Sequence, residues 1–122
     1  MDDGRLTLTV LLYFYGELLT EKQRECCELY YNEDLSLSEI AEQSGISRQG
    51  VWDNIRRAES ALREFEEKTG LIRRLGEQRK GLEAIREKTE RLRGLTQGPA
   101  RDAADEVLSA VNALIGNGSY GI

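Results

Sequence analysis

The stretch from Leu37 to Arg56, LSEIAEQSGISRQGVWDNIR, constrains the fold of this 122-residue chain more than any other. It has apolar residues at its fourth, tenth and fifteenth places, a small residue at its fifth and a glycine at its ninth. These places are held by Ile40, Ile46, Val51, Ala41 and Gly45. Two short helices that touch at a small residue and turn sharply at a glycine need this spacing. We therefore predict a helix-turn-helix unit.

Capping signals mark where the helices of the N-terminal part begin. Thr20 followed by Gln23 has the spacing of a capping box and predicts a helix that runs to about Tyr31. Ser36 with Glu39 repeats that spacing at the start of the motif, and an alternative serine cap lies two residues later. Before them, a broadly apolar helix is expected from about residue 7 to residue 19.

The second helix of the motif is predicted to begin after Ser47 and to continue well beyond a normal recognition helix. Gly70 is expected to kink or end it. A charged helix then follows with a narrow apolar seam, formed by Gln78, Leu82, Ile85, Thr89 and Leu92. Pro99 suits the first turn of a last amphipathic helix. The predicted organisation is a helix-turn-helix domain over 1–68, a charged amphipathic helix over 69–97, and a C-terminal amphipathic helix with a mobile tail over 98–122.

The fold class predicted from these features is all-α, a helix-turn-helix bundle with long C-terminal helices. A single proline and few aromatic residues in a highly charged chain agree with it. The seam spans only about two heptads, which is too short for an independent helix, so it needs a neighbour. We expect a homodimer; the alternative is that the C-terminal helix folds back and covers the seam within one chain.

Several function classes are not expected. The chain has no histidine, no phosphate-binding loop of the GxxxxGK type and no nucleophile paired with a base, so we predict no enzyme and no cofactor. Of its two adjacent cysteines, Cys26 and Cys27, at least one is interpreted as a core residue, and neither a disulfide between them nor a zinc site is expected. No apolar run approaches the length of a membrane span, which predicts a cytoplasmic protein without membrane contact.

The motif's second helix supplies the candidate site. It is expected to present Ser47, Arg48, Gln49, Trp52, Asp53 and Arg56 outward, with Arg57 and Arg63 as further phosphate contacts. Arginine and glutamine can pair with base edges, and a serine at a helix N-terminus can take a phosphate. Residues 1–68 nevertheless hold 8 Lys/Arg against 15 Asp/Glu, which opposes binding to a polyanion. Solvated helix residues are the alternative. We predict that Trp52 packs against a neighbouring helix or a second subunit. Stacking on a base is the alternative.

Residues 14–62 resemble two groups of bacterial proteins. The layout from LTEKQRECCELYY to SLSEIAEQSGIS is similar to the promoter-reading helix-turn-helix in the fourth conserved region of sigma factors. The closer resemblance is to the YlxM family, through LLTEKQ, ELYY with D.SLSEIAE, and SRQGV.DNI.R.E. Trp52 stands where that family usually has tyrosine. Beyond Leu71 the resemblance is expected to fade.

The resemblance to YlxM proteins implies a regulatory role at the signal recognition particle. Partners implied by it are nucleic acid, either DNA or the RNA of the particle, and the particle's GTPase. The contact residues that it implies are Ser47, Arg48, Gln49, Asp53, Asn54 and Arg56. Two alternatives stay open: a DNA-binding transcription regulator, and a protein-interaction module that keeps the fold without the nucleic-acid contact.

Overall fold

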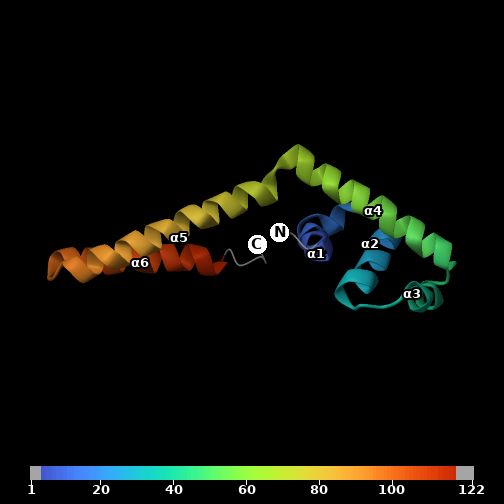
Figure 1. Ribbon diagram of the computed structural model, residues 1–122, viewed down its shortest axis with the longest axis horizontal. Coiled ribbons are helices and arrows are strands. Elements are labelled where there is room, and N and C mark those ends of the chain that lie inside the picture. Colours follow the sequence, from blue (N-terminus) through green and yellow to red (C-terminus); the bar gives the residue numbers. More distant parts are fainter. Residues whose placement is uncertain (1–3, 118–122) are drawn as a thin grey trace. The chain divides into compact units, whose positions relative to one another are not determined.

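The computed structural model describes the backbone of residues 4–117 and the side chains of residues 7–116. This part of the chain is all helical, with six α-helices and no strand (Figure 1). It divides into two compact units, Met1–Gly70 and Leu71–Ile122. The predicted all-α class is confirmed. The tail predicted at the C-terminus lies outside the described residues from Gly118 onward.

The first unit contains four helices: α1 (Gly4–Tyr15), α2 (Glu21–Cys27), α3 (Leu37–Ser44) and α4 (Arg48–Thr69). A short 3-10 turn, Gly16–Leu18, follows α1, and a π-helical turn, Glu28–Asn32, follows α2. In Figure 1 the long α4 runs past α1 and α2, and α3 lies near its N-terminal end.

The expected caps are present at the atomic level. The Thr20 side chain accepts the N–H of Gln23, and the Gln23 side chain accepts the N–H of Thr20, both at 3.2 Å. Ser36 and Glu39 exchange the same pair of bonds at 3.1 and 2.8 Å, so Ser36 is the cap of α3. Each box satisfies two backbone N–H groups that a helix start leaves unpaired, which is why the chain enters both helices at these residues.

The helix after Thr20 differs in detail from its predicted form. Regular α-helix stops at Cys27, and the chain widens into the π-helical turn before it leaves the helix. The local sequence does not explain this change. It is accompanied by a hydrogen bond between two residues that are distant in sequence. The Tyr31 hydroxyl, at the end of the widened turn, donates to the carboxylate of Glu59 on α4.

The core of the first unit forms beneath the predicted motif. Cys26, Ile40, Val51 and Ile55 are fully buried against one another, and Ala41 and Ile46 pack at the edge of this cluster. Gly45 ends α3 with φ 72°, the left-handed conformation predicted for the turn. The helix-turn-helix geometry is therefore held by apolar contacts from below and by a glycine at the bend.

The second unit is a helical hairpin. α5 (Leu71–Leu95) and α6 (Pro99–Asn117) are joined by residues 96–98, and α6 runs back along α5 (Figure 1). Gly70 ends α4 with φ 61° and separates the units, and Gly98 turns the hairpin with φ 66°. Arg93 on α5 forms an ion pair with Asp105 on α6, which fixes the register of the two helices. The fold-back weighed as an alternative to dimerisation is thus present.

The single apolar seam predicted on α5 is wrong in one respect. Leu82 and Thr89 are half-buried in the hairpin, but Ile85 and Leu92 remain 47% and 53% exposed. The physical reason is that α6 packs along one edge of the seam, where arginines 79, 86 and 93 of α5 are also half-buried. The expected seam therefore contains two separate rows of side chains, of which the hairpin covers one.

Candidate nucleic-acid interface

The N-terminal half of α4 is the surface that a helix-turn-helix would offer to a ligand. Ser47 caps the helix, with its hydroxyl accepting the N–H of Gly50 at 2.9 Å. Val51 and Ile55 point into the core, and this orientation turns the intervening positions to solvent. The predicted site residues Ser47, Arg48, Gln49, Trp52, Asp53, Arg56 and Arg57 are exposed.

Asn54 is positioned differently from the other candidates. It is half-buried, and its side-chain amide donates to the backbone carbonyl of Gly50 at 2.8 Å. Because this bond turns the amide back along α4, Asn54 stabilises the first turns of the helix rather than extending outward.

Charge on α4 is divided between its two halves. From Ser47 to Arg57 the helix carries three arginines against Asp53, whereas residues 58–69 carry four glutamates against Arg63 and Lys68. Within α4 the acid is therefore concentrated away from the turn, whereas Glu39 and Glu42 on α3 are exposed close to it. Asp53 itself accepts a hydrogen bond from the Gln49 side chain at 3.0 Å. This bond partly satisfies the carboxylate and also occupies an amide that could otherwise read a base.

The arginines in the N-terminal half of α4 have no acidic partner among the described residues: Arg48, Arg56 and Arg57 are exposed and unpaired. Lys22, Arg24 and Lys68 are each paired with a glutamate three or four residues away. Arg63, in the distal half of α4, is exposed and has no acidic partner among the described residues. Unpaired guanidinium groups on one surface are available to neutralise phosphates.

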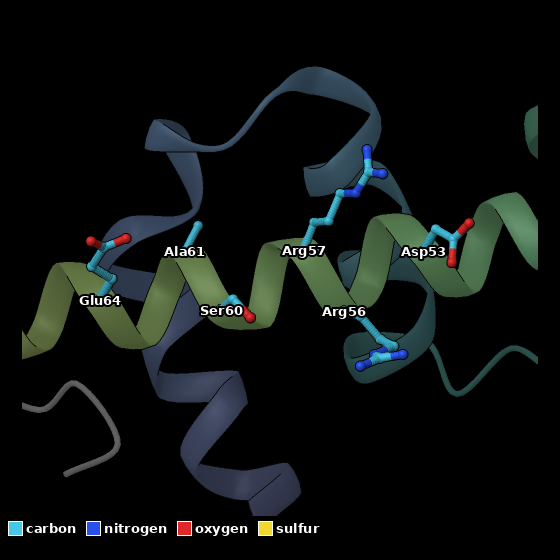
Figure 2. Close-up of a pocket in the computed structure, with 6 residues that line it drawn as sticks. All are labelled: Asp53, Arg56, Arg57, Ser60, Ala61 and Glu64. Carbon is cyan, nitrogen blue, oxygen red and sulfur yellow. The ribbon is translucent and has the colours of Figure 1, made fainter.

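Two concave features adjoin these arginines. A shallow depression runs along α4 between Asp53 and Glu64, and Figure 2 shows Arg56 and Arg57 diverging from the helix at its centre. A second groove lies at the N-terminal end of α4, and it is lined by Tyr30, Leu37, Arg48, Gln49 and Trp52. Trp52 was predicted from sequence, whereas Tyr30 and Leu37 were not, because only the folded motif brings them beside α4.

Trp52 is 38% exposed and forms one side of the second groove. Its expected packing against a neighbour is met only in part, because a sizeable fraction of the indole still faces solvent. Tyr30 comes from the π-helical turn after α2. The groove therefore combines two aromatic rings with an arginine and an amide.

Other observations limit the chemistry of the protein. Among residues 7–116 no group of three or more His, Cys, Asp or Glu side chains could hold a metal ion. No described helix combines the length and the apolar character that crossing a membrane requires. Cys26 and Cys27 are free thiols in the core, and burial raises the pKa of both. Ser44, a polar residue inside the turn, has a buried hydroxyl without a hydrogen-bond partner among the described residues.

The fold and this surface define a helix-turn-helix protein. Residues 3–98 match a family model described as "Putative helix-turn-helix protein, YlxM / p13 like". The chain belongs to this family, UPF0122. The match reaches the end of α5, so the expectation that the resemblance fades beyond Leu71 is wrong.

Relatives agree with the family model. The chain is 54% identical over 95 residues to a UPF0122 protein of Thermoanaerobacter sp., an alignment that covers 72% of this chain and 81% of the relative. It is 46% identical over 94 residues to one of Geobacillus kaustophilus, with 77% and 86% covered. One of Halalkalibacterium halodurans is 44% identical over 91 residues, with 75% and 84% covered.

Proposed function

We propose that this protein is a non-enzymatic, RNA-binding accessory of the signal recognition particle, and that the N-terminal half of α4 is its RNA contact. The observation that carries the proposal is the group of exposed, unpaired arginines on the outer face of a helix-turn-helix, namely Arg48, Arg56 and Arg57. The particle as the target rests on the resemblance to YlxM proteins. A cytoplasmic location and contact with the particle's GTPase belong to the same proposal.

The excess of acidic residues in the chain should weaken the RNA contact, but it does not argue against a contact at the N-terminal half of α4. The net charge of the whole chain is −5, but the segment Ser47–Arg57 has three basic residues against one acidic residue. Since the Debye length is about 8 Å at physiological salt, the glutamates in the distal half of α4 are largely screened from a ligand at Arg48. Glu59 and Glu64 lie closer to Arg56 and Arg57 and should weaken the contact there. We expect an affinity that is moderate and dependent on salt.

The groove at the N-terminal end of α4 favours RNA over duplex DNA. Tyr30 and Trp52 offer aromatic faces, and the Arg48 guanidinium offers donors beside them. Unpaired bases in RNA loops stack on aromatic side chains and hydrogen-bond through edges that a duplex keeps hidden. A paired base in B-form DNA cannot enter such a groove without leaving its stack.

DNA binding by a transcription regulator is the second candidate function. The helix-turn-helix spacing and the resemblance to the sigma-factor region support it, because such motifs place their second helix in the major groove. The bond between Gln49 and Asp53 argues against it, since it engages a side chain that would read adenine. A protein-interaction module is the third reading and predicts no affinity for either nucleic acid.

Fluorescence anisotropy across a salt series separates these readings. The full chain is titrated into particle RNA and into random duplex DNA between about 50 and 200 mM salt. We expect tighter binding to the RNA, with affinity falling steeply as salt rises. Tighter binding to the duplex would favour the regulator, and no binding to either would leave the interaction module.

A charge-matched pair of variants locates the contact. Arg56→Gln should lower the slope of log affinity against log salt by about 0.7 to 0.9, the contribution of one phosphate contact, and the addition of Arg57→Gln should bring the loss to about 1.4 to 1.8. Lys68→Gln, at the far end of the same helix, should leave the slope unchanged. Equal slopes for the double arginine variant and the unsubstituted protein would exclude this surface of α4 from the contact.

A further inference from the structure

We propose that the α5–α6 hairpin packs face to face on the hairpin of a second copy of this chain, so that the dimer is held by a four-helix bundle. The inference concerns the second unit and does not depend on RNA binding by the first. It rests on two rows of side chains on each helix, one used within the chain and one left exposed.

The inner rows hold the hairpin together. On α6 the row is apolar and consists of Ala104, Leu108, Val111 and Ile115, of which all but Leu108 are buried. On α5 the half-buried row is Arg79, Leu82, Arg86, Thr89 and Arg93. Both rows repeat at alternating intervals of three and four residues, the spacing by which two helices pack along their length.

The outer rows have the same spacing and no partner in the hairpin. On α6 the outer row is Ala103, Val107, Ala110 and Leu114, all exposed. On α5 it is Gln78, Gly81, Ile85, Lys88, Leu92 and Leu95, again all exposed. A helix that packs on one neighbour needs one apolar row, whereas a helix in a four-helix bundle needs two, because it contacts two neighbours.

The two outer rows lie on the same side of the hairpin. Ile85 and Leu92 each directly precede an inner-row residue of α5, as Val107 and Leu114 do on α6. Two antiparallel helices are related by a local two-fold axis perpendicular to the plane that contains both. Rotation about this axis exchanges the helices without exchanging the two sides of the plane. Residues that directly precede the inner row therefore lie on the same side of the hairpin on both helices. The Arg93–Asp105 ion pair sets the register, which brings Leu92 level with Val107. By the same register Ile85 lies level with Leu114.

The opposite side of the hairpin is polar. It carries Glu83 and Glu90 on α5 and Asp105 and Asn112 on α6, each of which directly follows an inner-row residue. The contrast between the two sides matters because exposed apolar residues scattered over a surface are ordinary, while a row confined to one side indicates an interface.

A second copy of the chain fits this face better than an unrelated partner. Small and large residues alternate along the outer row of α6, so a two-fold axis can place Val107 and Leu114 of one copy against the alanines of the other. Residues 78–95 rise about 26 Å, and two packed helices are about 20 Å across. Two faces of this size cover about 1,040 Å², close to the roughly 1,200 Å² at the lower end of specific interfaces.

Sedimentation equilibrium of the full chain without nucleic acid tests the proposal. We expect a mass of twice 13.8 kDa at micromolar concentration. Val107→Glu with Leu114→Glu should reduce the mass to one chain, because it buries two carboxylates in the interface. The control, Ser109→Glu with Asn112→Glu, adds the same charge to exposed positions of α6 away from the outer row and should remain dimeric.

Circular dichroism of each variant shows whether it remains folded. If the double outer-row variant loses helix signal, Ala110→Glu replaces it, since it adds a charge to the outer row while removing no buried group. A mass of one chain for the unsubstituted protein would overturn the proposal. A dimer that persists in a folded outer-row variant would overturn it equally, because the interface would then lie elsewhere.

Discussion

Gly45 is the residue on which the geometry of the motif depends. Its φ of 72° belongs to the left-handed region, and its N–H donates to the carbonyl of Ala41 at 3.0 Å as α3 ends. A side chain would meet no neighbour within 4 Å at this position, so any cost of substitution arises from the backbone conformation alone. The position therefore isolates one physical effect.

Gly45→Ala should lower the free energy of unfolding by about 1 to 2 kcal/mol, the cost of placing an L-residue in the left-handed region. Gly76→Ala is the control, because Gly76 lies inside α5, also with nothing within 4 Å, and has no positive φ. That variant should gain about 0.5 to 1 kcal/mol. Urea unfolding followed by circular dichroism measures both. Two changes of the same sign would contradict the assignment of Gly45 to the turn.

The buried thiols give the protein a pH dependence above neutrality. Burial, with a smaller contribution from Glu59, raises the pKa of Cys27 from 9.0 to about 12. Burial, and then the hydrogen bond to Glu59, raise the pKa of Tyr31 as well. For a group whose folded-state pKa is raised, stability is complete below the unfolded pKa and is lost as pH rises towards the folded one.

Between pH 9 and about 12 the folded state keeps the Cys27 proton that the unfolded state has lost. The free energy of unfolding should therefore fall with pH, and Cys27 should contribute about 1.4 kcal/mol per pH unit. Cys27→Ala removes one titrating group, so its stability should fall less steeply over the same range. Urea unfolding at a series of pH values compares the two slopes, and equal slopes would show that the thiol does not titrate differently in the two states.

At the scale of elements, the start of α4 combines stability with function in one side chain. The Ser47 hydroxyl accepts a hydrogen bond from the Gly50 N–H. Ser47 also directly precedes Arg48, at the N-terminal end of the proposed RNA surface. Ser47→Ala should cost about 1 kcal/mol of stability through loss of the cap. Ser47→Asp preserves a cap and should hold stability within about 0.5 kcal/mol, but its charge should weaken RNA binding. Urea unfolding and anisotropy measure the two effects separately, and undiminished RNA affinity in the aspartate variant would place the phosphates away from this end of α4.

Helix starts and the motif turn could be predicted from sequence because their causes are local. The boxes at Thr20 and Ser36 and the glycine at residue 45 act within four residues of themselves. The π-helical turn after α2 could not be predicted in this way, because it accompanies a bond between Tyr31 and Glu59, which are 28 residues apart. The groove at α4 needs Tyr30 from one element and Trp52 from another, so its aromatic pair emerged only from the fold.

The same distinction explains the error on α5. Spacing alone shows that Leu82, Ile85 and Leu92 lie along one narrow apolar seam of the helix, but it does not show which of them a neighbour covers. That depends on where α6 crosses, which is set by the turn at Gly98 and by the Arg93–Asp105 ion pair. The exposure of the candidate residues on α4 was easier to predict, since it follows directly from the buried positions of the motif.

At the scale of the whole molecule, the account assigns different partners to the two units. We propose that the first unit binds RNA through its unpaired arginines and aromatic groove, and that the second packs its side rich in apolar and small residues on its own copy. Dimerisation would double the number of RNA contacts in one particle without requiring either site to be strong, because the second contact becomes intramolecular. The modest local charge of α4 is consistent with such an arrangement.

The central claim is that the first turns of α4 carry the nucleic-acid contact. Its most direct test is an NMR titration of the full chain with signal recognition particle RNA, followed through the backbone amide signals. The account predicts that shifts concentrate at residues 47–57 and at Tyr30 and Leu37, which line the adjoining groove. Shifts confined to the α5–α6 hairpin, or no shifts at RNA concentrations that saturate anisotropy, would contradict it.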